Sequence, residues 1–153
     1  MGLDMWLYKK SYVKNSDYMK PEEKYDISIK KNGKDVEHIN KDNITYITEE
    51  IGYWRKFNAL HNYIVANHQD GVDDCRDTYL TKNDLEKLLN ILLEIQKDHN
   101  KADALLPTTP GFFFGGTEYG DYYFNQIDYT VELLSKYTSV DNSNCEFTYS
   151  SSW

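Results

Sequence analysis

Trp54, Asn58 and His61 are the residues whose types and spacing best suit the binding of a small molecule. They follow one another at steps of four and three residues, which on a helix places side chains one above another. An indole offers a stacking surface, and an amide beside an imidazole offers hydrogen-bond donors and acceptors. Because ligand sites combine an apolar wall with a few placed polar groups, the set favours a planar ligand.

Residues 107–124 form the second half of this candidate site. The segment holds seven aromatic residues and four glycines, and glycine permits close approaches of the backbone that other residues prevent. We expect it to cover the helix, which gives a candidate ligand-binding set of Trp54, Asn58, His61, Phe113, Thr117, Glu118 and Tyr119. The alternative is that Asn58 and His61 bind the backbone of a buried loop, since buried peptide groups need partners.

A turn rich in aspartate is a weaker candidate, for a metal-binding or catalytic site. Asp70, Asp73 and Asp74 offer oxygen ligands for a divalent cation, although their spacing differs from that of an EF-hand loop and a solvated acidic turn is the alternative. Cys75 with His61 or His68 could be written as nucleophile and base, but no third group or oxyanion hole is specified. The sequence therefore predicts no catalytic residue and no cofactor.

Three helices are expected to position these groups. The first spans residues 48–68, with Thr48 as its cap and an apolar stripe formed by Tyr53, Phe57, Leu60 and Ile64. The second follows Thr81, which forms a capping box with Asp84. The third begins near Thr117 or Asp121 and is marked by Phe124, Ile127, Val131 and Leu134.

Alternating side chains predict a small antiparallel sheet beside the helices. Leu3, Met5 and Leu7 alternate with larger or polar residues, and Asn32-Gly33 is a strong hairpin signal that places Ile29 opposite Val36. Residues 145–149 also alternate and are a candidate partner of residues 3–8, followed by a frayed tail at Ser150–Ser152. The expected fold is α+β: one domain over residues 1–153, with an N-terminal strand, an Asn-Gly hairpin and this candidate strand packed on about three helices.

Composition narrows the functional classes. The net charge is −8, distributed as +3 over residues 1–34 and −11 over the rest; this disfavours nucleic acid, which proteins bind through Lys and Arg. No apolar run approaches the roughly 18 residues of a membrane span. Cys75 and Cys145 match no metal spacing, which favours reduced thiols in a cytosolic protein, while their pairing is left open.

Four blocks of the chain resemble a family of small bacteriophage-encoded proteins, largely of unassigned function. They are Met-Gly-Leu-Asp-Met-Trp-Leu-Tyr at residues 1–8, Tyr-Trp-Arg-Lys-Phe-Asn-Ala-Leu-His-Asn at 53–62, Gln-Asp-Gly-Val-Asp-Asp-Cys at 69–75, and the block at 105–124 that begins Leu-Leu-Pro-Thr-Thr-Pro-Gly. The resemblance implies phage origin and action in the cytoplasm of the bacterial host. It carries over no catalytic residue.

Three functions are then in competition. The leading one is a non-enzymatic phage protein that inhibits or sequesters a host component, such as a host-defence protein with a basic surface, in the manner of anti-CRISPR proteins. The second is a binder of a small aromatic ligand or nucleotide signal at the Trp54, Asn58 and His61 site. The third is a metal-assisted hydrolase that uses the aspartate turn.

Overall fold

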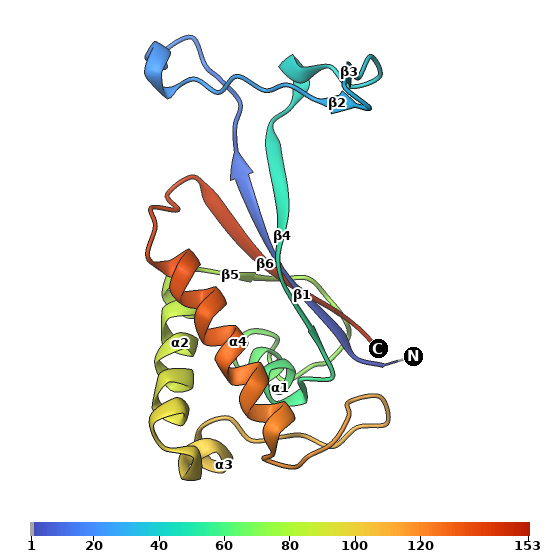
Figure 1. Ribbon diagram of the computed structural model, residues 1–153, viewed down its shortest axis with the longest axis vertical. Helices are drawn as coiled ribbons and strands as arrows, with labels where there is room; N and C mark the ends of the chain where they lie inside the picture. Colours follow the sequence, from blue (N-terminus) through green and yellow to red (C-terminus); the bar gives the residue numbers. More distant parts are fainter. Residues whose placement is uncertain (1) are drawn as a thin grey trace.

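The structure, a computed structural model, describes residues 2–153 as a body from which a long arm projects (Figure 1). The body contains a four-stranded antiparallel sheet and all the α-helices. We define the arm as residues 13–45, which leave the body at the end of β1 (Asp4–Tyr12) and return at the start of β4 (Tyr46–Arg55). The predicted α+β class is confirmed.

The sheet has the strand order β4-β1-β6-β5. The two remaining strands are β5 (Thr78–Leu80) and β6 (Cys145–Ser152). Both neighbours of β1 are antiparallel to it, with Asp4 opposite Arg55 of β4 and opposite Ser152 of β6. The C-terminal strand is therefore confirmed beside residues 3–8, but the expected frayed tail at Ser150–Ser152 is wrong because these residues are paired within the sheet.

The helix predicted over residues 48–68 is also wrong in its first half. Residues 46–55 form β4, and α1 (Asn58–His68) begins only after a turn in which Lys56 has a φ of 58°. The register between β1 and β4 shifts between Leu7 and Tyr8, so Ile51 has no counterpart in β1. This bulge interrupts the period of two along β4, and the large side chains on either side of it imitate a helical spacing.

Of the remaining helices, the first and the last agree with the sequence pattern, and the short middle one was not predicted. They are α2 (Lys82–Lys97), the short α3 (Ala102–Leu105) and α4 (Asp121–Thr138). At the start of α2 the Thr81 hydroxyl accepts from the amide of Asp84 at 3.1 Å, and the Asp84 carboxylate accepts from the amide of Thr81 at 2.8 Å. The predicted capping box is confirmed. Within residues 2–153, no helix has the length and apolarity to cross a bilayer.

The core lies between the helices and one face of the sheet. Its sheet side comes from Leu3, Met5 and Leu7, which are buried as their alternation predicts. Its helix side comes from α1, α2 and α4, and includes Leu60, Ile64, Leu85, Leu88, Leu92, Ile95, Ile127 and Leu134. The other face of the sheet carries the alternate side chains, among them Trp6 and Tyr53.

The Asn-Gly hairpin forms with the predicted register but in a different place. Asn32 and Gly33 have φ of 52° and 76°, and the amide of Val36 donates to the carbonyl of Ile29 at 3.1 Å. Its strands β2 (Lys30–Lys31) and β3 (Lys34–Asp35) make a separate two-stranded sheet inside the arm. The expectation that it joins the main sheet is therefore wrong. Among residues 13–45 only Val13 is buried, so the arm packs little apolar surface against the core.

Candidate functional site

Asn58 joins the start of α1 to the aromatic segment. Its side chain is 3% exposed, and its Nδ2 donates to the carbonyls of Phe114 at 3.0 Å and Gly116 at 2.8 Å. Its Oδ1 accepts from the amide of Thr109 at 2.9 Å. The amide orientation follows from these partners, because the reverse orientation would place an acceptor against two carbonyls. Both ends of the side chain are thus engaged with loop backbone.

His61 lies one turn further along α1 and is 1% exposed. Its Nε2 lies 2.9 Å from an oxygen of Asp73, and its Nδ1 lies 2.7 Å from the hydroxyl of Tyr149. Because a carboxylate only accepts, a neutral ring that satisfies both contacts donates from Nε2 to Asp73 and accepts from Tyr149 at Nδ1. The Phe114 ring packs against the imidazole in a T-shaped arrangement, with ring centres 5.3 Å apart.

Trp54 does not belong to this group. It lies on β4, not on a helix, and its Nε1 donates to the hydroxyl of Thr130 on α4 at 2.8 Å. The indole is buried in the core. The prediction that Trp54, Asn58 and His61 lie on one helix face is therefore wrong. β4 ends at Arg55, so Trp54 belongs to the strand, whereas Asn58 and His61 belong to α1.

The other candidates in the aromatic segment are held by contacts within the body. The hydroxyl of Tyr119 donates to Asp103 at 3.0 Å and accepts from the amide of Thr108 at 3.2 Å. The carbonyl of Thr117 accepts from the Thr108 hydroxyl at 2.9 Å. Phe113 is half-buried, with its carbonyl bound to the amide of Leu3, while the side chain of Glu118 is exposed.

The structure therefore brings Asn58 and His61 to the aromatic segment and fills the space between them. The polar atoms that would contact a ligand are bonded to the backbone of residues 109–116, to Tyr149 and to Asp73. For Asn58 this is the alternative to a ligand site, in which the side chain binds the backbone of a buried loop. His61 instead binds two side chains, Tyr149 and Asp73.

The aspartate turn contributes one member to the same network. Asp73 accepts from His61 and, through its other oxygen, from the indole of Trp153 at 3.1 Å. Asp70 and Asp74 instead each lie 3.7 Å from the guanidinium of Arg76. Across residues 2–153, no cluster of three or more His, Cys, Asp or Glu side chains has the geometry to hold a metal ion.

The two cysteines do not pair. Cys75 and Cys145 are both free thiols. Cys145 lies on β6, where its Sγ is 3.3 Å from the hydroxyl of Ser11 on β1. Cys75 has a φ of 60° in the turn before β5.

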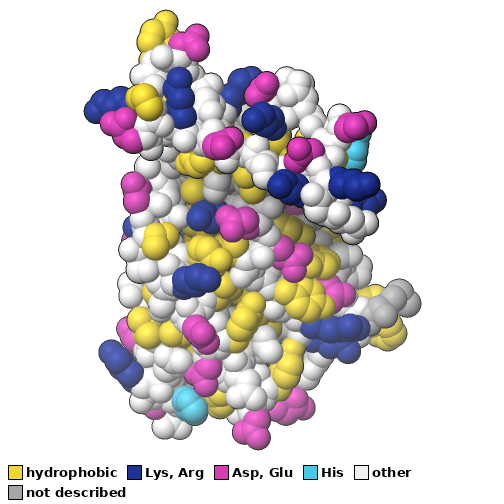
Figure 2. Space-filling model, turned by 45° about the horizontal axis from the view of Figure 1, so that its top comes forward, with side chains coloured by type: hydrophobic (Ala, Val, Ile, Leu, Met, Phe, Trp, Pro, Cys, Tyr) yellow, Lys and Arg dark blue, Asp and Glu magenta, His cyan; other side chains and the backbone are white. Residues whose placement is uncertain are grey.

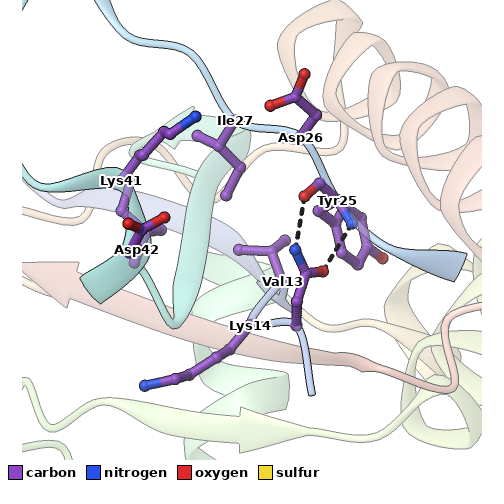
Figure 3. Close-up of a pocket in the computed structure, with 9 residues that line it drawn as sticks. Val13, Lys14, Tyr25, Asp26, Ile27, Lys41 and Asp42 are labelled. Carbon is purple, nitrogen blue, oxygen red and sulfur yellow. Dashed lines mark hydrogen bonds between the residues drawn. The ribbon is translucent and has the colours of Figure 1, made fainter. Parts of the chain in front are cut away.

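The larger hollows of the molecule lie in the arm, outside the residues that the sequence singled out. One groove of about 360 Å³ lies between the outgoing and returning segments of the arm, close to the body. In Figure 3, Val13 and Ile27 point toward one another across it, and Lys41 and Asp42 stand on its rim. The lining comprises Val13, Lys14, Asn15, Tyr25, Asp26, Ile27, Lys41, Asp42 and Ile44.

The side chain of Asn15 binds the backbone of Tyr25 across this groove, in the way that a neighbouring strand would. Nδ2 of Asn15 donates to the carbonyl of Tyr25 at 2.8 Å, and Oδ1 of Asn15 accepts from the amide of Tyr25 at 2.7 Å (dashed in Figure 3). A second groove of about 410 Å³ continues from the first and shares Asp26, Ile27 and Lys41 with it. The two together line one continuous side of the arm.

The arm also exposes large apolar side chains. Tyr18 is 99% exposed, and Tyr25 and Ile39 are 45% and 42% exposed. Figure 2 shows yellow side chains at the far end of the arm, interspersed with Lys and acidic residues. Tyr25, Ile27 and Ile29 alternate with polar residues along this part of the arm, beside the Asn32-Gly33 hairpin that we expected in the main sheet.

Comparison of the chain with protein-family models, with curated proteins and with solved structures finds no match. The resemblance to phage proteins stays a prediction.

Proposed function

We propose that this chain is a non-enzymatic binding protein that holds a protein partner through its arm. The observation that carries the proposal is that residues 13–45 bury one side chain while they expose Tyr18, Tyr25 and Ile39 beside two grooves. Ordering a chain segment costs conformational entropy, which burial in the core normally offsets. Exposed tyrosines next to a groove are features that protein interfaces use.

The charge distribution supports a partner with a basic surface. Residues 13–45 hold seven Lys and seven Asp or Glu, so the net charge of −8 resides in the body. A partner seated on the arm would meet this acidic body next to it, and opposite charge speeds association and favours the correct orientation. In keeping with the resemblance, the partner we propose is a component of a bacterial host, such as a defence protein, that a phage protein inhibits or sequesters.

The test is affinity purification from bacterial lysate with three forms of the tagged chain, at low and at high salt. The first is wild type, and the second replaces Tyr18, Tyr25 and Ile39 with serine. The control is Phe112→Ser, because Phe112 is 96% exposed on the segment at the other end of the molecule (Figure 1). We expect one host protein to be retained by wild type and by the control and lost from the arm variant.

Two results would count against the proposal. One is that no host protein is retained at either salt concentration. The other is that the same protein is retained equally by wild type and by the arm variant, which would place its binding site on the body. Circular dichroism checks that the arm variant is folded, as expected because none of its three changed side chains is buried.

A further inference from the structure

One half of the outer edge of the sheet has unpaired backbone. The amide of Val13 donates to the carbonyl of Thr45 at 2.9 Å. This bond determines which residues in the first part of β4 direct their amide and carbonyl groups toward β1 and which direct them away. The amides and carbonyls of residues 47 and 49 point toward β1, whereas those of Tyr46, Thr48 and Glu50 point away from the sheet. Residues 46–50 are all exposed. Within residues 2–153, no group forms a hydrogen bond with these three outward amides and carbonyls.

The other half of the same edge is covered by α4. The outward amide of Tyr53 donates to the hydroxyl of Tyr129 at 3.2 Å. The hydroxyl of Tyr122 donates to the outward carbonyl of Arg55. Proteins usually protect exposed strand edges, because an open edge pairs with other strands. The contrast within one strand leaves residues 46–50 open to pairing with a further strand.

We propose that this further strand belongs to a second copy of the chain, paired antiparallel with residues 46–50 about a two-fold axis at Thr48. A two-fold axis makes the same patch serve both subunits. It places Tyr46 of each copy opposite Glu50 of the other, and Ile47 opposite Glu49 of the other. The result is one continuous sheet of eight strands.

The charges of the edge suit this register. No acidic residue faces another acidic residue across the axis, and the central pair is Thr48 with Thr48, a favourable cross-strand combination. On β1, the Lys10 ammonium lies 4.1 Å from the centre of the Tyr46 ring. Glu50 of the second copy lies on the far side of that ring, one strand spacing of about 4.8 Å further on. Each dimer therefore contains two Lys10–Glu50 attractions between copies.

Charge reversal tests the pairing by sedimentation velocity. Wild type is expected to be a dimer. Lys10→Glu and Glu50→Lys are each expected to weaken self-association about threefold or more at low salt, since each converts two attractions between exposed charges into repulsions. An equimolar mixture of the two variants is expected to recover the dimer, because a mixed pair restores opposite charges at both contacts. Effects within one chain cannot produce that recovery.

A change at Thr48 tests the backbone contribution separately. Thr48→Pro removes an amide that faces away from β1, a position where an edge strand tolerates proline. It is expected to give a folded monomer by circular dichroism, while Thr48→Val remains dimeric. A wild type that stays monomeric at high protein concentration, as it would if the edge served an extended segment of an unrelated protein, overturns the proposal. So does a dimer that none of the charge variants alters.

Discussion

Replacing Asn58 with alanine tests whether this side chain holds the aromatic segment on the body. Asn58→Ala removes three hydrogen bonds, to the carbonyls of Phe114 and Gly116 and from the amide of Thr109. At about 0.5–1.5 kcal/mol each, their loss lowers the free energy of unfolding by about 1.5–4.5 kcal/mol. The lower end applies if water reaches the released backbone groups, and the upper end if the segment stays closed over them.

The matched control is Asn62→Ala, on the same helix. Asn62 is half-buried, and across residues 2–153 its side chain forms no hydrogen bond. Its replacement is expected to change the free energy of unfolding by less than about 0.5 kcal/mol. Asn58→Asp is a second comparison, because a carboxylate keeps the acceptor for Thr109 but places negative charge against two carbonyls. It is expected to destabilise the fold at least as much as alanine does.

Urea denaturation gives the free energy of unfolding, and hydrogen exchange locates the effect. The amide of Thr109 is expected to lose its protection in Asn58→Ala, while the amides of α2 retain theirs under native conditions. The reasoning is refuted if Asn58→Ala costs no more than Asn62→Ala, or if the Thr109 amide stays protected. Either result would mean that the segment is held by its rings alone.

Three further predictions concern buried or paired side chains. Tyr149→Phe leaves Nδ1 of His61 without its partner and is expected to cost about 1–2 kcal/mol of unfolding free energy, measured in urea; a neutral effect would contradict the network. Burial raises the pKa of Asp84, but hydrogen bonds from Thr81 outweigh it and lower that pKa below 3.8. This contribution is present above the ordinary pKa and is lost as pH falls through the lowered one, so melting temperature should fall less steeply with acid in Asp84→Asn; identical acid profiles would contradict it. Burial raises the pKa of Tyr123 and of Tyr149 above 10.0, so the stability they contribute is lost as pH rises beyond that value. Phenolate absorbance should show these two ionising only with unfolding, and full ionisation of all tyrosines in the native state would count against this.

Local signals predicted the parts of the fold that are determined locally. The capping box of Thr81 with Asp84 and the Asn32-Gly33 turn each specify their geometry within four residues, and both form as expected. The alternation of Leu3, Met5 and Leu7 likewise identified the buried face of β1. In these places propensity, capping and hydrophobic pattern all agree, which is the condition for a reliable prediction.

β4 was misassigned because its position is determined by distant parts of the chain. Gly52 and Trp54 face the core, but the bulge at Ile51 shifts the residues before it out of alternation. The apolar pattern resumes in α1 after only two charged residues, Arg55 and Lys56, and the positive φ of Lys56 marks the boundary. A three-residue strand such as β5 is too short to show a period at all.

The sequence predicted part of the candidate site correctly. The sequence identified Asn58 and His61 as polar residues among apolar neighbours, and both do meet the aromatic segment. It could not tell a ligand pocket from a filled junction, because that depends on whether Phe114 enters the space beside His61. Asp73 and Tyr149, which complete the network, lie 12 and 88 residues from His61, so their contact with it is not encoded in any local spacing.

The place of β6 in the sheet has a consequence for how the chain folds. This last strand lies between β1 and β5, and its pairing with β1 joins Asp4 to Ser152. Until residues 145–152 have been synthesised, β5 has no neighbour and the sheet lacks an interior strand. Loop closure over such a sequence separation is slow. We therefore expect the body to fold only once residues 145–152 have left the ribosome, with the half-made sheet exposed to chaperones until then.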